Sequence, residues 1–414
     1  MSTQTSNRTF FGWRVMWAAF TVAVFGWGVG FYGPPIFLHT VVETRGWSVG
    51  LVSTAVTTHF LLGAVLVANM PAVYARFGLS RTTVVSAVCL ALGTAGWALA
   101  AAPWQLFAAT LISAVGWAGT GAMAVNTAIA PWFERRRPAA LSMAYNGASV
   151  GGVLFSPVWV FLIALFGFPV AAMIVGIVLV GTLCVLSVRY FSVTPQDLGT
   201  VPDGEAATEI SDTAGSEKPT LPGRALWANR GFLTYMAGFS IGLFAQIGII
   251  AHLFSLLVPA LGTQGAGFAA GFATACAVAG RSLVGWFLPP AMDRRFAAAL
   301  TYLVQACGCL AFVLAGGDSV ALLLLGVFLF GVGIGNVTSL PPLIAHAEFA
   351  PADVPRAIAL STAMAQATFA FAPALFGLLR EWEAAPDRTA TPLFFLIAGA
   401  IQIAAAAVYM TGRR

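Results

Sequence analysis

Twelve long apolar stretches follow one another along this 414-residue chain. A helix needs about 20 mostly apolar residues to cross the hydrocarbon core of a bilayer. In lipid a spanning segment must satisfy its own backbone hydrogen bonds, which helices of this length do. The sequence therefore predicts an all-α polytopic membrane protein with twelve transmembrane helices, at about residues 13–38, 49–72, 83–101, 105–130, 139–165, 168–190, 231–258, 265–288, 297–315, 319–346, 357–380 and 392–411.

The composition agrees with a membrane protein, because 59% of the residues are hydrophobic and 8% are charged, against roughly 25% charged in soluble domains.

All Lys and Arg residues except Arg45, Arg281, Arg380 and Arg388 fall on one side of the predicted helices. Basic loops face the cytoplasm, so we expect a multi-pass protein of the cell (inner) membrane with both termini cytoplasmic. The net charge of +5 is then explained by the basic residues of the cytoplasmic loops, which orient the protein in the membrane. It requires no nucleic acid partner.

One polar stretch divides the chain into two halves of six predicted spans. We expect an N-terminal bundle at 1–193, a cytoplasmic linker at 194–229 rich in Pro, Gly, Ser, Thr and acids, and a C-terminal bundle at 230–414. The halves share a short sequence echo, ALSMA at 140–144 and ALSTA at 359–363, each followed by a proline in mid-helix. Two six-helix bundles with parallel pseudo-symmetry are the expected arrangement.

Arg281 is the candidate around which the functional prediction is built. It lies inside the apolar run 265–288, whereas every Asp and Glu falls in a predicted loop or at a helix end. A charge in the membrane interior is costly and marks a functional site. We therefore expect the missing anion to be the substrate, because a guanidinium holds a carboxylate through two parallel hydrogen bonds. The alternative is that Arg281 binds helix-end carbonyls or reaches toward the cytoplasm as a gating residue.

Further polar side chains are candidates for substrate binding, each weighed against ordinary packing between helices. They are Tyr32 in the first predicted helix, Asn126 in the fourth, Asn146 in the fifth, Gln246 in the seventh and Gln366 in the eleventh. His252, in the outer half of the seventh helix, is the first candidate for proton coupling, since His titrates near neutral pH. His59 lies within the second helix, where packing is the favoured interpretation.

Several loops resemble those of a known family. The loop Arg76-Phe-Gly78-Leu-Ser-Arg81 resembles the gating loop of the major facilitator superfamily, although Pro71 and Ala75 replace its glycine and aspartate. The stretches FGWR at 11–14, GWS at 46–48 and PWFERRRP at 131–138 are similar to the monocarboxylate porter and oxalate–formate exchanger branch. The resemblance implies the major facilitator fold, a gating role for Arg76, Gly78 and Arg81, and a carboxylate-binding role for Arg281.

Two departures from that branch narrow the expectation. Animal-type members carry an aspartate four residues before the arginine, where this chain has Ala277, and the dicarboxylate exchanger carries a lysine in the eleventh helix, where residues 357–379 hold no Lys or Arg. One cavity cation suits one carboxylate better than two. We expect the substrate to be a monocarboxylate.

The predicted function is a secondary active transporter, and not an enzyme, that moves a small organic anion by alternating access. Proton symport and anion exchange both stay open, and efflux of hydrophobic compounds or drugs is the alternative within transporters. No nucleotide-binding loop is present, and the five Cys have no metal-ligand spacing. We therefore expect no cofactor, and a monomer whose partners are the substrate anion and the bilayer, together with a coupling proton if the mode is symport.

Overall fold

The computed structural model describes residues 10–204, 219–289, 291–383 and 392–413, which form helices and no strands. Residues 205–218 of the predicted linker, and Arg388, lie outside the described residues. The α-helices are α1 Phe11–Gly30, α2 Gly33–Arg45, α3 Val49–Phe77, α4 Leu79–Leu99, α5 Pro103–Thr120, α6 Ala122–Ile129, α7 Arg137–Tyr190, α8 Ala225–Ala228, α9 Arg230–Phe287, α10 Arg294–Ala315, α11 Val320–Glu348, α12 Val354–Phe369, α13 Ala372–Glu383 and α14 Pro392–Thr411.

Helices α7 and α9 are too long to cross a membrane once. The 54 residues of α7 would extend about 80 Å as one straight helix, against a hydrocarbon core of about 30 Å. Each is broken by a glycine with positive φ, Gly167 at 76° in α7 and Gly262 at 68° in α9. These angles favour glycine because it lacks Cβ. Each of the two helices is therefore a pair of crossing segments joined by a tight turn.

Three other predicted spans consist of two helices with a break between them. The first is α1 and α2, the fourth is α5 and α6, and the eleventh is α12 and α13. In the first, Pro34 at the start of α2 has no N–H to continue the helix. With these pairs joined and α7 and α9 divided, the described residues contain twelve apolar crossings. The predicted all-α, twelve-helix fold is confirmed.

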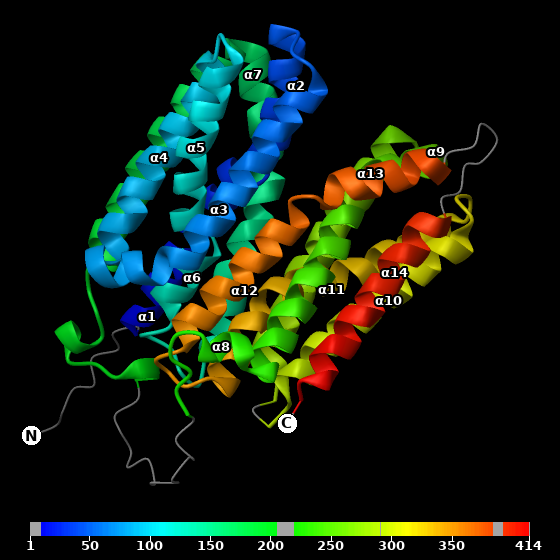
Figure 1. Ribbon diagram of the computed structural model, residues 1–414. Coiled ribbons are helices and arrows are strands. Elements are labelled where there is room, and N and C mark those ends of the chain that lie inside the picture. Colours follow the sequence, from blue (N-terminus) through cyan, green and yellow to red (C-terminus); the bar gives the residue numbers. More distant parts are fainter. Residues whose placement is uncertain (1–9, 205–218, 290, 384–391, 414) are drawn as a thin grey trace, which may run out of the picture.

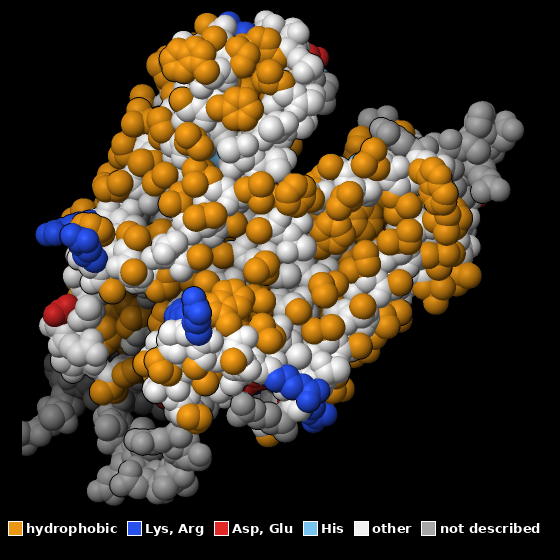
Figure 2. Space-filling view, viewed as in Figure 1, with side chains coloured by type: hydrophobic (Ala, Val, Ile, Leu, Met, Phe, Trp, Pro, Cys, Tyr) orange, Lys and Arg blue, Asp and Glu red, His pale blue; other side chains and the backbone are white. Residues whose placement is uncertain are grey.

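Helices α1–α7 pack against one another, as do α9–α14, and the two bundles stand side by side (Figure 1). Helix α1 begins and α14 ends at the same end of the molecule, which we call the near end; the opposite end is the far end. The bundles meet toward the near end and diverge at the far end, and apolar side chains cover their flanks (Figure 2). Such flanks suit contact with lipid.

The described part of the connection between the bundles is fixed at both ends. Asp203 accepts hydrogen bonds from the backbone N–H groups of Glu134 at 3.1 Å, Arg135 at 2.7 Å and Arg136 at 3.2 Å. Beyond residues 205–218, the Leu221 N–H donates to Asp353 at 2.7 Å. The chain between the bundles is thus held by two carboxylates.

Replacing Asp203 by alanine is expected to release residues 199–204 from the turn before α7. Loss of these charge-assisted bonds at a half-buried site costs about 1 kcal/mol, which is roughly a fivefold rise in the undocked population. Hydrogen–deuterium exchange of this segment measures the change. Asp197→Ala is the matched control, because among the described residues the Asp197 carboxylate bonds to Thr194 and not to the turn before α7. Equal exchange in the two variants would contradict the docking role.

Candidate functional site

A cavity lies between the two bundles; together with the open solvent at its mouth, it takes in about 1040 Å³ of space not occupied by atoms. Its wall is largely aromatic and aliphatic, with a few polar groups from both bundles. From the N-terminal bundle come Trp27, Phe31, Tyr32, Trp117, Tyr145 and Ser149, and from the C-terminal bundle Tyr235, Gln246, Arg281, Thr338, Thr362, Gln366 and Phe369, among others. An apolar pocket with a few convergent polar groups is typical of a small-molecule site.

Arg281 is the charged residue of this wall, and it is only 3% exposed. Its Nε donates to the Gly335 carbonyl of α11 at 2.9 Å, and its Nη1 donates to the Tyr145 carbonyl of α7 at 2.5 Å. Nη1 is also 3.2 Å from Asn146 Oδ1. In the described part of the chain no carboxylate pairs with it. Neutral oxygens therefore hold this buried cation.

The donors of Arg281 are unequally occupied. Nε and Nη1 have short bonds, whereas Nη2 has one contact, at 3.5 Å to the Thr338 hydroxyl. The sequence predicted two parallel bonds to a substrate carboxylate. The structure leaves Nη2 as the group most available to an anion, so a second bond requires displacement of a neutral partner. The alternative prediction was that Arg281 binds helix-end carbonyls; in this conformation it bonds to carbonyls within α7 and α11, at Tyr145 and Gly335, and not at helix ends.

Close helix packing brings Arg281 to this position. A Cβ on Gly335 would lie 2.4 Å from the Ala277 carbonyl oxygen and 2.7 Å from Arg281 Cβ. Only glycine lets α9 and α11 approach this closely, as is common between membrane helices. Nothing in the sequence connects Gly335 with Arg281, because the spacing of residues along one helix does not show which other helix faces them.

Three other predicted residues line the same cavity. Tyr32 lies at the break between α1 and α2, and Gln246 accepts a hydrogen bond from Gln305 at 2.7 Å. Gln366 joins the bundles: its Nε2 donates to the Phe60 carbonyl at 2.8 Å, and its Oε1 accepts from Trp117 Nε1 at 3.1 Å. The structure therefore brings Tyr32, Gln246, Gln366 and Arg281 to one space.

The two predicted asparagines lie beside the cavity and not among its lining residues. Asn146 accepts from Arg281 and donates to Ser282 Oγ at 2.9 Å. Asn126 donates to the Tyr145 hydroxyl at 2.7 Å, and it lines a second hollow nearer the termini. Tyr145 and Trp117, which connect these groups to the cavity, were not predicted; an aromatic residue in an apolar run gives no signal that separates a cavity wall from a lipid face.

His252 and the loop between α3 and α4 lie outside the cavity lining. His252 Nε2 is 3.0 Å from the Pro373 carbonyl, and its ring packs against Phe394. Gly78, with a φ of 79°, is the single residue between α3 and α4, whereas Arg76 lies in the last turn of α3, where it is exposed and stacks over the Phe77 ring at 5.2 Å. Arg81 is also exposed. The roles predicted for these residues stay predictions.

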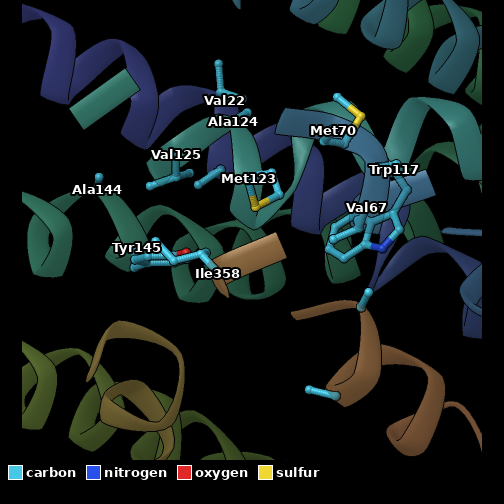
Figure 3. Packing of buried hydrophobic residues seen from close by; sticks show 14 of the residues in the cluster. Val22, Val67, Met70, Trp117, Met123, Ala124, Val125, Ala144, Tyr145 and Ile358 are labelled. Atoms are coloured by element: carbon cyan, nitrogen blue, oxygen red, sulfur yellow. The ribbon is translucent and has the colours of Figure 1, made fainter. Parts of the chain in front are cut away.

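A layer of apolar side chains separates the central cavity from the second hollow, which takes in about 2100 Å³ including open solvent. Ile358 of α12 lines both spaces and lies near Tyr145 and Met123 of the other bundle (Figure 3). Nearby, Ser142 Oγ donates to the Arg281 carbonyl at 2.7 Å, and Trp13 stacks on Trp286 with centroids 6.2 Å apart. The cavity is thus closed toward the near end.

Two bundles of membrane helices around a central cavity, closed at one end and diverging at the other, define a carrier that exposes its site to one side at a time. The family model described as Major Facilitator Superfamily matches residues 16–373, and the chain belongs to this family of transporters. A solved structure of the proton:xylose symporter XylE bound to 6-bromo-6-deoxy-D-glucose is similar, with a TM-score of 0.71, 14% identity, and coverage of 97% of this chain and 95% of that chain. No curated protein matches the sequence.

Proposed function

We propose that this transporter carries a small organic anion, specifically a monocarboxylate, across the cell's inner membrane by alternating access. The observation that carries the proposal is Arg281, a buried cation in the cavity wall that no described carboxylate neutralises. A substrate carboxylate supplies the missing charge. A charge-assisted bond to it is about twice as strong as a bond to a neutral carbonyl, so the anion competes with the present partners of Arg281.

The rest of the cavity wall supports a substrate with an apolar body and one charged end. Trp27, Phe31, Tyr235 and Phe369 offer aromatic surface, whereas a second Lys or Arg is not found among the described lining residues. A dicarboxylate would leave its second charge without a partner, which is costly in a water-poor site. Efflux of a cationic compound is less well supported, since the described lining contains no acid.

Proteoliposomes containing the purified protein test the proposal with a panel of radiolabelled probes. The panel holds a monocarboxylate, lactate; an aromatic monocarboxylate, benzoate; a dicarboxylate, oxalate; a pentose, xylose; and a lipophilic cation, tetraphenylphosphonium. We expect uptake of at least one monocarboxylate at rates at least tenfold above those of oxalate and the cation. Uptake of xylose and of no acid would replace the proposal by sugar transport, which is what the similar XylE performs.

Proton symport is the proposed mode of coupling, and His252 is the candidate that the sequence indicates. A proton entering with a monocarboxylate makes the cycle electroneutral. Proteoliposomes that contain the protein are expected to accumulate the identified acid when the outside is more acidic than the inside. Accumulation that depends only on acid loaded on the opposite side would instead support exchange.

A further inference from the structure

The end of α1 contains a backbone carbonyl that its own helix does not satisfy. Gly30 is the last residue of α1, and the residue four positions on, whose N–H would bond to its oxygen, is Pro34. His59 of α3 replaces this missing donor, with Nε2 3.0 Å from the Gly30 oxygen. Because a carbonyl oxygen only accepts hydrogen bonds, Nε2 carries a hydrogen.

The other ring nitrogen has a partner that suits two protonation states. His59 Nδ1 is 2.9 Å from Ser113 Oγ, and that hydroxyl is 3.0 Å from the Thr110 carbonyl. When Nδ1 is unprotonated, the Ser113 hydroxyl donates to it. When Nδ1 gains a proton, it donates to Ser113 Oγ, and the hydroxyl turns to donate to Thr110. The proton forms one N–H bond on the lone pair of Nδ1, and one hydroxyl rotation accommodates it.

His59 is only 1% exposed, and burial disfavours a charged ring; what offsets this cost is backbone charge and not an acid. The carbonyl end of α1 carries a partial negative charge of about half an elementary unit, which stabilises a cationic His by roughly 0.5–2 kcal/mol. Among the described residues, the polar groups that contact His59 are the Gly30 carbonyl, the Ser113 hydroxyl and the Thr110 backbone. Helices α5 and α6, which pack against α3, have no titratable side chain.

The other neighbouring helices carry charges near their ends. On α2, His39 pairs with Glu43 at 3.3 Å, and these side chains are 72% and 65% exposed. The remaining titratable groups on the helices that pack against α3 are Arg45 on α2, Arg81 and Cys89 on α4, and Arg356 on α12. None of them has a recorded contact with His59. A change of charge at His59 therefore affects its surroundings mainly through the hydrogen bonds of its own ring.

The hydrogen-bonded residues Gly30 and His59 are next in the chain to residues of the cavity region. Gly30 precedes Phe31 and Tyr32, which line the cavity, and Tyr32 stands at the start of α2. The residue after His59 is Phe60, whose carbonyl accepts the bond from Gln366 of the opposite bundle at 2.8 Å. Phe31 and Phe60 of one bundle and Phe369 of the other pack together, with ring centroids no more than 6.0 Å apart.

We propose that His59 is a proton-binding site, in which protonation of Nδ1 is linked through the Gly30 carbonyl and Phe60 to the arrangement of Tyr32 and Gln366 around the substrate. This site is an alternative to His252 for the coupling proton. The identity of the cotransported anion rests on the proposed function, but binding of a proton at His59 does not.

Proton binding is measured directly, without a substrate. The protein is prepared with ¹⁵N-labelled histidine rings and studied in liposomes by solid-state NMR from about pH 8 to about pH 4. This range covers an ordinary His and extends lower because burial disfavours the charged ring. The signals of His59 are assigned by their loss in His59→Gln. We expect Nδ1 to change from unprotonated to protonated within this range while Nε2 keeps its hydrogen. A ring that keeps one state throughout would overturn the proposal.

The link to transport is measured in proteoliposomes with lactate as the probe. Glutamine retains an N–H donor toward Gly30 but binds no proton. We expect His59→Gln to keep lactate–lactate exchange and to lose accumulation driven by a pH gradient, so that its accumulation ratio falls to about 1. His39→Gln, the matched control at an exposed ion pair, should accumulate like the wild type. Gradient-driven accumulation by His59→Gln at the wild-type level would overturn the link.

Ser113→Ala gives a second, milder test. It removes the acceptor of the Nδ1–H group and leaves the Gly30 bond intact. We expect exchange to continue while the midpoint of the NMR titration moves to lower pH; an unchanged midpoint would contradict the assigned role of Ser113. If the wild type transports no acid of the panel, the proposed function fails, whereas the titration of His59 still decides the proton site.

Discussion

Replacing Arg281 by alanine is expected to reduce monocarboxylate uptake by roughly a hundredfold. The reason is the loss of a charge-assisted pair worth about 3 kcal/mol in a buried site. Arg281→Lys should lose nearly as much, because an ammonium group cannot bond to Gly335, Tyr145 and the substrate in the planar geometry of a guanidinium. Initial rates of uptake in proteoliposomes measure the effect.

Arg281 also bridges the bundles, so a loss of transport has two explanations that must be separated. Binding of the substrate to the detergent-solubilised protein, followed by thermal shift, distinguishes them. A substrate-binding Arg281 predicts that both variants lose the stabilisation by monocarboxylate, whereas a purely structural bridge predicts that it is retained. Arg189→Ala, at an exposed arginine that stacks on Tyr190, is the matched control and should behave as wild type. Full uptake by Arg281→Ala would refute the role in transport.

Replacing Gly285 is the other change for which we expect a large effect. A Cβ there would lie 2.2 Å from Ser142 Cβ and 3.1 Å from the Pro138 carbonyl oxygen, which are not flexible side-chain ends. Even alanine must push α9 away from α7, at the contact between these two helices that helps to close the cavity toward the near end. Forcing an extra methyl group into a packed contact costs about 1–3 kcal/mol. Uptake should fall roughly tenfold in Gly285→Ala and further in Gly285→Leu.

The same substitutions should change which end of the cavity is open. In Gly285→Ala and Gly285→Leu, hydrogen–deuterium exchange is expected to rise at the start of α7 and at the end of α9. Gly271→Ala and Gly271→Leu are the matched controls on the same helix, because nothing lies within 4 Å of a Cβ on Gly271. If all four variants transport alike, transport does not depend on close packing of α7 against α9.

The crossings were predictable because each depends on a property of one segment. An apolar run of sufficient length must become a helix wherever it meets lipid. The prediction placed a boundary between 165 and 168, and the structure turns at Gly167. It treated 13–38 as one helix, whereas the structure breaks it near Phe31 and continues to Arg45. The missing N–H of Pro34 was visible in the sequence as the cause of this break.

The polar residues of the site were only partly separable from packing residues. Gln366 and Asn126 are both amides inside apolar runs, yet Gln366 lines the cavity between the bundles and Asn126 lines the hollow nearer the termini. His59 was assigned to packing because a single helix shows neither Gly30 nor Ser113 beside it. Helical spacing gives the face on which a residue lies, but it does not say what that face contacts.

By itself the sequence determined that the chain crosses a membrane about twelve times, divides in the middle, and holds one arginine in an apolar run without an acid to match it. These are consequences of segment length and of charge, which are local. The tertiary structure decided that Arg281 meets Gly335 and Tyr145, and that Gln366 meets Phe60. Such contacts depend on the rotation and neighbours of each helix, and in lipid these are set by close packing at small residues such as Gly285 and Gly335.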